Sequence, residues 1–395
     1  MSAFALHRQT HELYWFERRA FLETAGYRLR PKFNPEYIPN AGWWALREYE
    51  AVHFKSSIMD AHRIVDNKPV MFKTVRSSVH PDEVEIALMF SSPPLAANPR
   101  NHCIPILDVL QDPEDAQKQI LVMPRFIEFS VPKFDTVGEV VDCFRQIFEG
   151  IEFMHENFVA HRDCCYFNIV QDPTLLFPVG YHPIHTWQDP EARNRANHIT
   201  RTECWPRYYL IDFGLSKKYD PADGPPLEDI ILAGDKSPPE HKTLFACNPF
   251  PTDIYFLGNL LKEDFLYPPE DSKKARFPHS IRPSLRFLEP LVKEMTLPDP
   301  SMRPTIGEVR RRFDELCSGL SEWQLRRPGQ RHSFGPLQLI RQLTRTLLRV
   351  HPLPRRTLVL SDSGSLELSK TMRDFYTQTQ LEKINNGSLP NDLDA

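Results

Sequence analysis

The sequence predicts an α+β fold in which strands come first and helices follow. The chain has 395 residues and is 41% hydrophobic, so it can bury a full core. Between residues 58 and 126, short apolar runs alternate with turn residues, as in the strands of one sheet. From residue 135 onward, apolar residues recur at three- and four-residue steps, which is typical of buried helix faces.

A hairpin is expected at the start of the strand-rich half. Residues 58–75, IMDAHRIVDNKPVMFKTV, predict two strands joined by the Asp66–Asn67 turn, with the second strand ending near Lys73. A short helix and two further strands follow, expected at residues 82–90, 102–110 and 118–126.

The helical half is expected to begin with one long helix between Asp135 and Phe158. It leads directly into AHRDCCYFN, so this motif should lie on a loop held by a rigid element. Helical periodicity returns between Asp253 and Cys317.

The chain divides into residues 1–50, 51–325 and 326–395, predicted as an N-terminal extension, a folded domain and a tail. The tail is expected to be basic and then disordered, because it holds eight arginines and no acidic residue up to Arg356 and turns polar beyond Ser361. Its residues 337–349 predict an amphipathic basic helix. Such a helix either docks on the domain, binds an acidic partner or anionic lipid, or stays solvated.

Composition excludes several classes of function. A net charge of −4 gives no reason to expect nucleic acid as a partner. No stretch reaches the roughly 18 apolar residues of a membrane span. The seven cysteines include no C-x-x-C pair and the N-terminus is too charged for a signal peptide, which predicts reduced thiols in a cytoplasmic or nuclear protein.

Three motifs hold the side chains that phosphoryl transfer needs, namely a base, oxygen ligands for magnesium and a cation for nucleotide phosphates. PVMFK places Lys73 at the end of a strand. HRDCCYFN offers Asp163 as the base and Asn168 as a metal ligand. LIDFGLS offers Asp212 as the second metal ligand.

In order and local structure these motifs resemble the eukaryotic protein-kinase superfamily, and in detail the kinase-like families expanded in mushroom-forming fungi. PPE with Glu240, DIYFLG from Asp253 to Gly258 and DPSMRPT with Arg303 resemble the C-terminal set of protein kinases, in which the arginine pairs with the glutamate. The resemblance covers residues 58–313. It implies a two-lobed protein-kinase-like fold, with a small antiparallel-sheet lobe and a larger helical lobe. ATP and Mg²⁺ would be the cofactors, and a Ser or Thr hydroxyl of a protein the substrate.

The resemblance also implies a nucleotide site. Lys73 should pair with a glutamate on the next helix, and Glu85 is the expected partner rather than Glu83, because apolar residues lie one turn beyond it. Met123 would lie at the back of the adenine pocket, and Arg125 in the hinge beside it. A surface acid and an ordinary core strand are the alternatives at these positions.

Two departures leave other functions open. No G-x-G-x-x-G precedes residue 58, and Gly42 is the only glycine nearby, so either nucleotide binding is weak or the Ser56–Ser57 neighbourhood forms the phosphate lid. The alternatives are a pseudokinase acting as a non-catalytic interaction module, and a small-molecule kinase. The spacing between Asn168 and Asp212 predicts an insertion at about residues 172–206, as a surface loop or, from its His and Cys residues, a zinc site.

Two further features concern regulation. Ser216, Tyr219 and Ser237 are the only hydroxyls between Asp212 and Glu240, so a constitutively formed activation segment is as plausible as one ordered by phosphate. The two cysteines that follow the expected base predict either buried packing or a redox switch.

Overall fold

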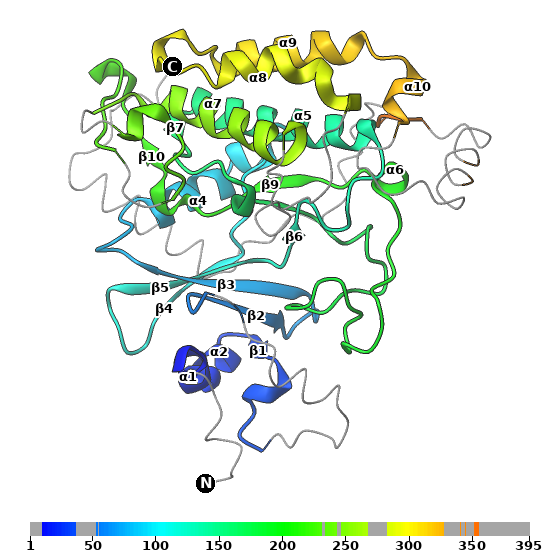
Figure 1. The fold of residues 1–395 in the computed structure, drawn as a ribbon. Helices are drawn as coiled ribbons and strands as arrows, with labels where there is room; N and C mark the ends of the chain where they lie inside the picture. The colour runs from blue at the N-terminus through cyan, green and yellow to red at the C-terminus, as the bar shows by residue number, and fades with distance from the viewer. Residues whose placement is uncertain are drawn as a thin grey trace.

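The computed structural model describes residues 10–36, 53, 55–230, 234–242, 246–267, 283–327, 340, 344 and 351–354. This part of the chain has a mixed α+β architecture, with an antiparallel sheet towards one end and most of the helices towards the other (Figure 1). The α+β class predicted from the sequence is therefore confirmed. No helix among these residues is long and apolar enough to cross a membrane.

Five antiparallel strands form the main sheet in the order β1-β2-β3-β5-β4. They are β1 (Tyr27–Leu29), β2 (Ile58–Arg63), β3 (Pro69–Arg76), β4 (Asp108–Gln111) and β5 (Lys118–Pro124). The predicted hairpin is confirmed as β2 and β3, and Asn67 takes a left-handed conformation in its turn (φ 54°). The predicted end near Lys73 is wrong, because β3 stays paired with β5 as far as Arg76. The strand expected at residues 102–110 is shorter than predicted, because Cys103 instead bridges Leu210 outside this sheet.

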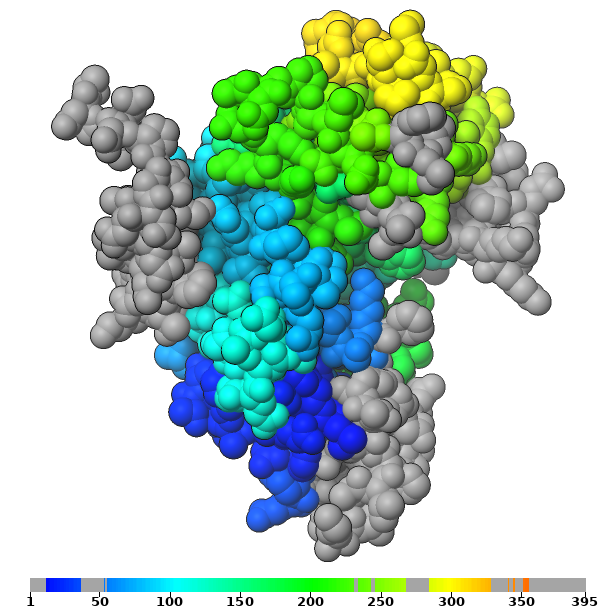
Figure 2. All heavy atoms as spheres, turned by 90° about the vertical axis from the view of Figure 1, so that its left-hand side faces the viewer, coloured from blue at the N-terminus to red at the C-terminus, as the bar shows by residue number. Residues whose placement is uncertain are grey.

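The N-terminal residues cover one face of the main sheet. Helices α1 (Thr10–Glu17) and α2 (Arg19–Thr24) lie beneath it, on the side away from the other helices (Figure 1). Trp15 is fully buried and stacks on Phe72 of β3 at 5.8 Å. Arg18 donates to Asp112 at 2.8 Å, at the β4–β5 turn seen in cyan against the dark blue N-terminal segment (Figure 2). This part of the expected N-terminal extension thus supplies a strand and a covering layer for the sheet.

The long helix predicted after Asp135 is α5 (Val137–Glu156), which ends two residues before Phe158. A capping box fixes its start, because Thr136 accepts from the Glu139 N–H and Glu139 accepts from the Thr136 N–H. The remaining helices are α4 (Glu83–Ser91), α6 (Arg201–Cys204), α7 (Pro249–Leu260), α8 (Glu289–Met295), α9 (Ile306–Ser318) and α10 (Glu322–Leu325). Helices α4, α5, α7, α8 and α9 enclose the largest apolar core.

Two small sheets frame the segment between α5 and α7. One pairs β7 (Val159–Ala160) with β10 (Lys217–Lys218), and the other has the order β6-β8-β9. The strands of the second are β6 (Ile127–Glu128), β8 (Ile169–Gln171) and β9 (Tyr208–Leu210). The insertion lies between β8 and β9 in the sequence, and these two strands pair directly with each other. It has its own small core, formed by Ile127, Leu176, Phe177, Tyr181 and Ala196.

The described part of the tail lies against the start of α5. Pro352 is buried, Leu353 packs against the largest core, and Arg327 accepts from the Val137 N–H at 2.9 Å. A side chain at Gly138 would clash with the Pro352 carbonyl, so this close approach requires glycine. The helix predicted at residues 337–349 lies outside the described residues, apart from two single positions.

Candidate active site

Lys73 forms the centre of the candidate site. It lies on β3, on the sheet face opposite the one that α1 and α2 cover. Its ammonium group contacts Oε1 of Glu83 on α4 and Oδ1 of Asp212, the latter at 2.6 Å. Burial lowers the pKa of Lys73, but the two carboxylates outweigh this effect and hold the pKa above its ordinary value. Lys73 is therefore a half-buried cation, with a side chain 17% exposed, that is shared between two acids.

The predicted partner Glu85 is wrong, because Lys73 pairs with Glu83. Glu83 is buried together with Ile86, Ala87 and Phe90, which lie three, four and seven residues further along α4. Glu85 is exposed, as expected for a residue two positions away on a helix. The apolar positions beyond Glu83 were the signal that could have identified it.

Asp212 reaches Lys73 because its backbone is in the left-handed region, with φ of 68°. It directly precedes the short 3₁₀ helix Phe213–Leu215, and the ring of Phe213 is buried beside Phe90. Burial raises the pKa of the Asp212 carboxyl, but the charge and hydrogen bond of Lys73 outweigh this and leave the pKa below its ordinary value. The carboxylate is thus held in its charged form.

Asp163 and Asn168 are joined directly. The Asn168 amide donates to Oδ2 of Asp163 at 2.7 Å and to its backbone oxygen at 2.9 Å. The other carboxylate oxygen of Asp163 is buried and has no hydrogen-bond partner in the described structure. Burial, with a contribution from Asp212, raises the pKa of Asp163, while His161 and Asn168 oppose the shift. Such a carboxylate can take up a proton more readily than an exposed one.

Asp253 on α7 holds the loop that carries Asp163. Its two carboxylate oxygens accept from the backbone N–H groups of His161 and Arg162, at 2.8 and 2.7 Å, and His155 lies 3.0 Å away. Arg162 is in the left-handed region (φ 64°), so the turn before Asp163 is sharp. Because Asp253 is fully buried, it fixes this strained turn to the helical core.

The predicted pair of Glu240 and Arg303 is confirmed. Two guanidinium nitrogens of Arg303 each donate to one oxygen of Glu240, both at 2.7 Å. Both side chains are almost inaccessible to solvent. The pair joins the end of the segment between Asp212 and Glu240 to the turn before α9.

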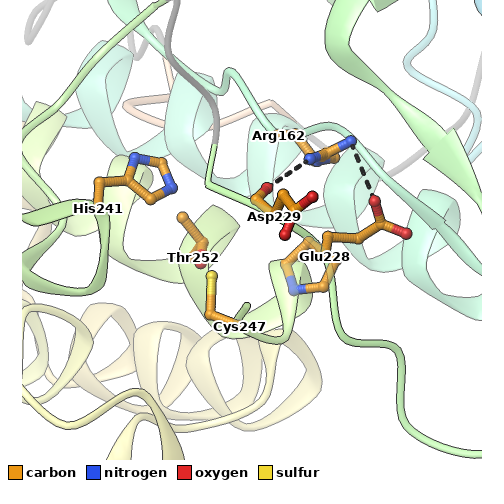
Figure 3. A pocket seen from close by; sticks show the side chains of 7 residues that line it. Arg162, Glu228, Asp229, His241, Cys247 and Thr252 are labelled. Carbon is orange, nitrogen blue, oxygen red and sulfur yellow. Dashed lines mark hydrogen bonds and ion pairs between the residues drawn. The ribbon is translucent and has the colours of Figure 1, made fainter. Parts of the chain in front are cut away.

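Glu228 ties the segment between Asp212 and Glu240, the expected activation segment, to the loop that carries Asp163. Its carboxylate contacts Lys217 at 2.7 Å and lies 4.0 Å from Arg162, whose guanidinium also donates to the Asp229 carbonyl at 3.4 Å. Glu228 and Cys247 exchange two backbone hydrogen bonds at 2.9 Å. Arg162, Glu228 and Cys247 line one small, open pocket, which also includes Asp229 and Thr252 (Figure 3).

The part of the site where adenine is expected contains a buried charged residue and is therefore not wholly apolar. Met71 lies opposite both Asp60 and Met123 in the sheet, so all three share the face that carries Lys73. Asp60 is fully buried and lies 2.7 Å from Nε2 of His53. No motif around Asp60 indicates a charged group at this place.

Several positively charged groups neutralise Asp60. Arg30 lies 3.1 Å from it, and Arg125 also acts on it electrostatically. Burial would raise the pKa of Asp60, but Arg30 and His53 outweigh it and hold the pKa below its usual range. The backbone of Arg125 donates to the Pro69 carbonyl at 3.2 Å, and its carbonyl accepts from Tyr181 of the insertion at 3.4 Å.

Neither of the two cysteines after Asp163 forms a disulfide. Cys164 is fully buried, and burial raises its pKa well above the ordinary value. Burial and the neighbouring Asp163 carboxylate raise the pKa of Cys165 to about 11. Packing therefore accounts for both residues better than a redox switch does, because thiolates are the reactive form.

The oxygen atoms at the site suit a hard cation. Asp212 offers carboxylate oxygens. Asn168 contacts Asp163 through its amide nitrogen, so its amide oxygen is not used in that contact. No group of three or more His, Cys, Asp or Glu side chains suited to a metal occurs in the described part of the chain, including the described insertion. Magnesium is typically held by only one or two carboxylates together with substrate phosphates, so the donor set fits that ion.

Comparison with known protein families and with curated proteins finds no match to this chain.

Proposed function

We propose that this chain is a protein kinase that transfers the terminal phosphoryl group of ATP to a Ser or Thr hydroxyl of a protein. One observation carries the proposal: the contact of Lys73 with Asp212 at 2.6 Å, beside the contact of Asp163 with Asn168 at 2.7 Å. The two pairs lie near each other, because Asp212 acts electrostatically on Asp163. A cation, two carboxylates and an amide are thus available at one site. Phosphoryl transfer depends on positioning and charge stabilisation by such groups.

Each side chain has a role that its surroundings support. Asp163 would orient the substrate hydroxyl and accept its proton, since one of its oxygens has no other partner. Lys73, held by Glu83, would contact the phosphates that are not transferred. Asn168 and Asp212 would hold Mg²⁺ through their oxygens. When bound, ATP supplies the phosphoryl group and Mg²⁺ offsets the charge of its phosphate oxygens.

A protein substrate is favoured over a small molecule by the C-terminal contacts. The Asp253 contacts with the loop and the buried Glu240–Arg303 pair are features that resemble protein kinases. The same resemblance favours a two-lobed kinase-like fold, in which the main sheet and α4 form the small lobe and the other helices of the largest core form the large one.

A second candidate, a non-catalytic interaction module, is favoured by one observation. Asp60, Arg30 and His53 form a buried charged cluster on the sheet face that would border the adenine ring. Adenine sites are usually apolar, and the Arg125 N–H that lies in the expected hinge already has a protein partner. The charged cluster could therefore exclude adenine.

Nucleotide binding separates these two candidates. The melting temperature of the full chain should rise with millimolar ATP and Mg²⁺, and the rise should be absent in the Asp212→Asn variant. A nucleotide that binds only the folded state stabilises it in proportion to the logarithm of its concentration. No shift in the wild-type protein at millimolar MgATP would favour the interaction module.

A further inference from the structure

The turn Lys55–Ser56–Ser57, directly before β2, is held by hydrogen bonds to each of its three carbonyl groups. The Thr74 N–H donates to the Ser57 carbonyl at 2.8 Å, and the indole N–H of Trp15 donates to the Ser56 carbonyl at 3.0 Å. The third contact is from the Ile58 N–H to the Lys55 carbonyl at 3.4 Å. Trp15 is fully buried in α1, so this turn is fixed to the layer that covers the far side of the sheet.

From this turn Lys55 points to the candidate site. Its ammonium group lies 3.8 Å from Oδ2 of Asp212, while Lys73 contacts Oδ1 of the same carboxylate. Lys55 is 59% exposed, and an ion pair of this kind contributes little to stability. Two cations on one carboxylate therefore need an explanation other than holding the fold together.

We propose that Lys55 binds the nucleotide phosphates and does so in place of the backbone N–H groups of a glycine-rich loop. The inference rests on the proposed kinase function. The residues before β2 lack the G-x-G-x-x-G that would bring N–H groups close to phosphates. A lysine supplies a full positive charge on a flexible stem where N–H groups would supply only partial charges, and Lys55 already reaches the carboxylate that faces Lys73.

Trp15 on α1 also helps to position Lys55. The indole both stacks on Phe72 and donates to the Ser56 carbonyl, which is adjacent to Lys55 in the chain. Trp15 is thus a positioning residue for Lys55. Losing its N–H should weaken phosphate binding even though Trp15 lies far from the reacting groups.

Binding of MgATP and of adenosine to the full chain, measured by isothermal titration calorimetry, tests the proposal without depending on turnover. Lys55→Met should weaken MgATP binding by about tenfold and leave adenosine binding unchanged, because adenosine has no phosphates. Lys55→Arg should restore most of the affinity. Lys68→Met is the matched control, since Lys68 is also an exposed lysine, 3.9 Å from a carboxylate, but at the far end of the β2–β3 hairpin.

Trp15→Phe tests the positioning role. It keeps a ring against Phe72 but has no N–H for Ser56, and it should weaken MgATP binding by roughly two- to fivefold with adenosine binding unchanged. A far-ultraviolet circular dichroism spectrum equal to that of the wild type would show that the variant is folded.

Three outcomes contradict the proposal in distinguishable ways. If Lys55→Met binds MgATP as well as wild type, Lys55 makes no phosphate contact, although the kinase function can still hold. If Lys55→Met binds MgATP more tightly, Lys55 instead blocks Asp212. If wild-type protein binds no MgATP, the proposed function and this inference both fall.

Discussion

Glu240 and Arg303 lie 63 positions apart in the chain and form a buried, bidentate ion pair. Removing either partner leaves a buried charge without its counterion, which destabilises proteins by about 3–5 kcal/mol. Glu240→Ala and Arg303→Ala should each lower the free energy of unfolding by this amount, measured by urea denaturation. MgATP affinity should change far less, because neither side chain belongs to the candidate site.

Glu315→Ala is the control, because Glu315 pairs with Arg311 on the exposed face of α9. It should lower the free energy of unfolding by less than about 1 kcal/mol. Equal stability losses in Glu315→Ala and Glu240→Ala would remove the basis for a special role of the buried pair.

The contribution of Glu240 to the free energy of unfolding should also depend on pH. Burial raises the pKa of Glu240, but hydrogen bonds from Arg303 outweigh this and hold it below the ordinary 4.5. A carboxyl with a lower pKa in the folded state stabilises the fold above its unfolded pKa and loses that effect as pH falls. The stability difference between wild type and Glu240→Gln should therefore be full at pH 7 and shrink below pH 4.5. A difference that grows at acid pH would contradict this sign.

Glu83 and Glu85 provide a matched pair of variants on one helix. Glu83→Gln removes the charge that holds Lys73, so kcat/KM for phosphoryl transfer should fall by about 100-fold, equivalent to roughly 2.7 kcal/mol of transition-state stabilisation. Glu85→Gln changes an exposed carboxylate and should alter kcat/KM by less than about twofold. Similar losses in the two variants would count against the Lys73–Glu83 pair.

Glu228 should order the activation segment without phosphorylation. It bridges Lys217 and Arg162, which are the groups that a phosphate would otherwise neutralise. Phosphatase treatment should leave wild-type activity unchanged, and Glu228→Gln should lower kcat by roughly three- to tenfold and speed proteolysis of the segment. Asp223→Asn, at an exposed position in the same segment, is the control.

A loss of activity after phosphatase treatment of the wild-type protein would contradict this role of Glu228. It would also point to a phosphorylated hydroxyl in the segment as the group that faces Arg162.

The tail should stabilise the domain through its contact with α5. Gly138→Ala would force the Pro352 carbonyl away, and truncation after Arg327 would expose the surface that Leu353 covers. Both should lower the melting temperature, by an amount equivalent to about 1–3 kcal/mol. Gly319→Ala is the control, because it meets only one atom at an ordinary distance. A truncated protein with an unchanged melting temperature would show that the tail does not dock.

Local patterns predicted much of the fold from the sequence. The hairpin of β2 and β3 followed from alternating apolar residues and the Asp66–Asn67 turn, and α5 followed from helical spacing. By contrast, β1 is three residues long and lies far from β2 in the chain. Its pairing depends on tertiary packing with α1 and α2, for which a short segment carries no signal.

The candidate site shows the same limit. Lys73 and Asp212 could be placed from motifs, but choosing between Glu83 and Glu85 required knowing which face of α4 is buried. Lys55 and Asp60 belong to no motif. Their positions follow from the sheet register and from contacts with α1 and with Arg30, which only the folded chain brings together.

The most direct test of the kinase assignment is transfer of labelled phosphate from [γ-³²P]ATP with Mg²⁺ to protein substrates and to the chain itself. Wild-type protein should label Ser or Thr residues, identified by phosphoamino-acid analysis. Asp163→Asn should reduce the rate by at least about 100-fold, because the base is lost, while retaining MgATP binding. No labelling by wild-type protein, or equal labelling by Asp163→Asn, would contradict the assignment.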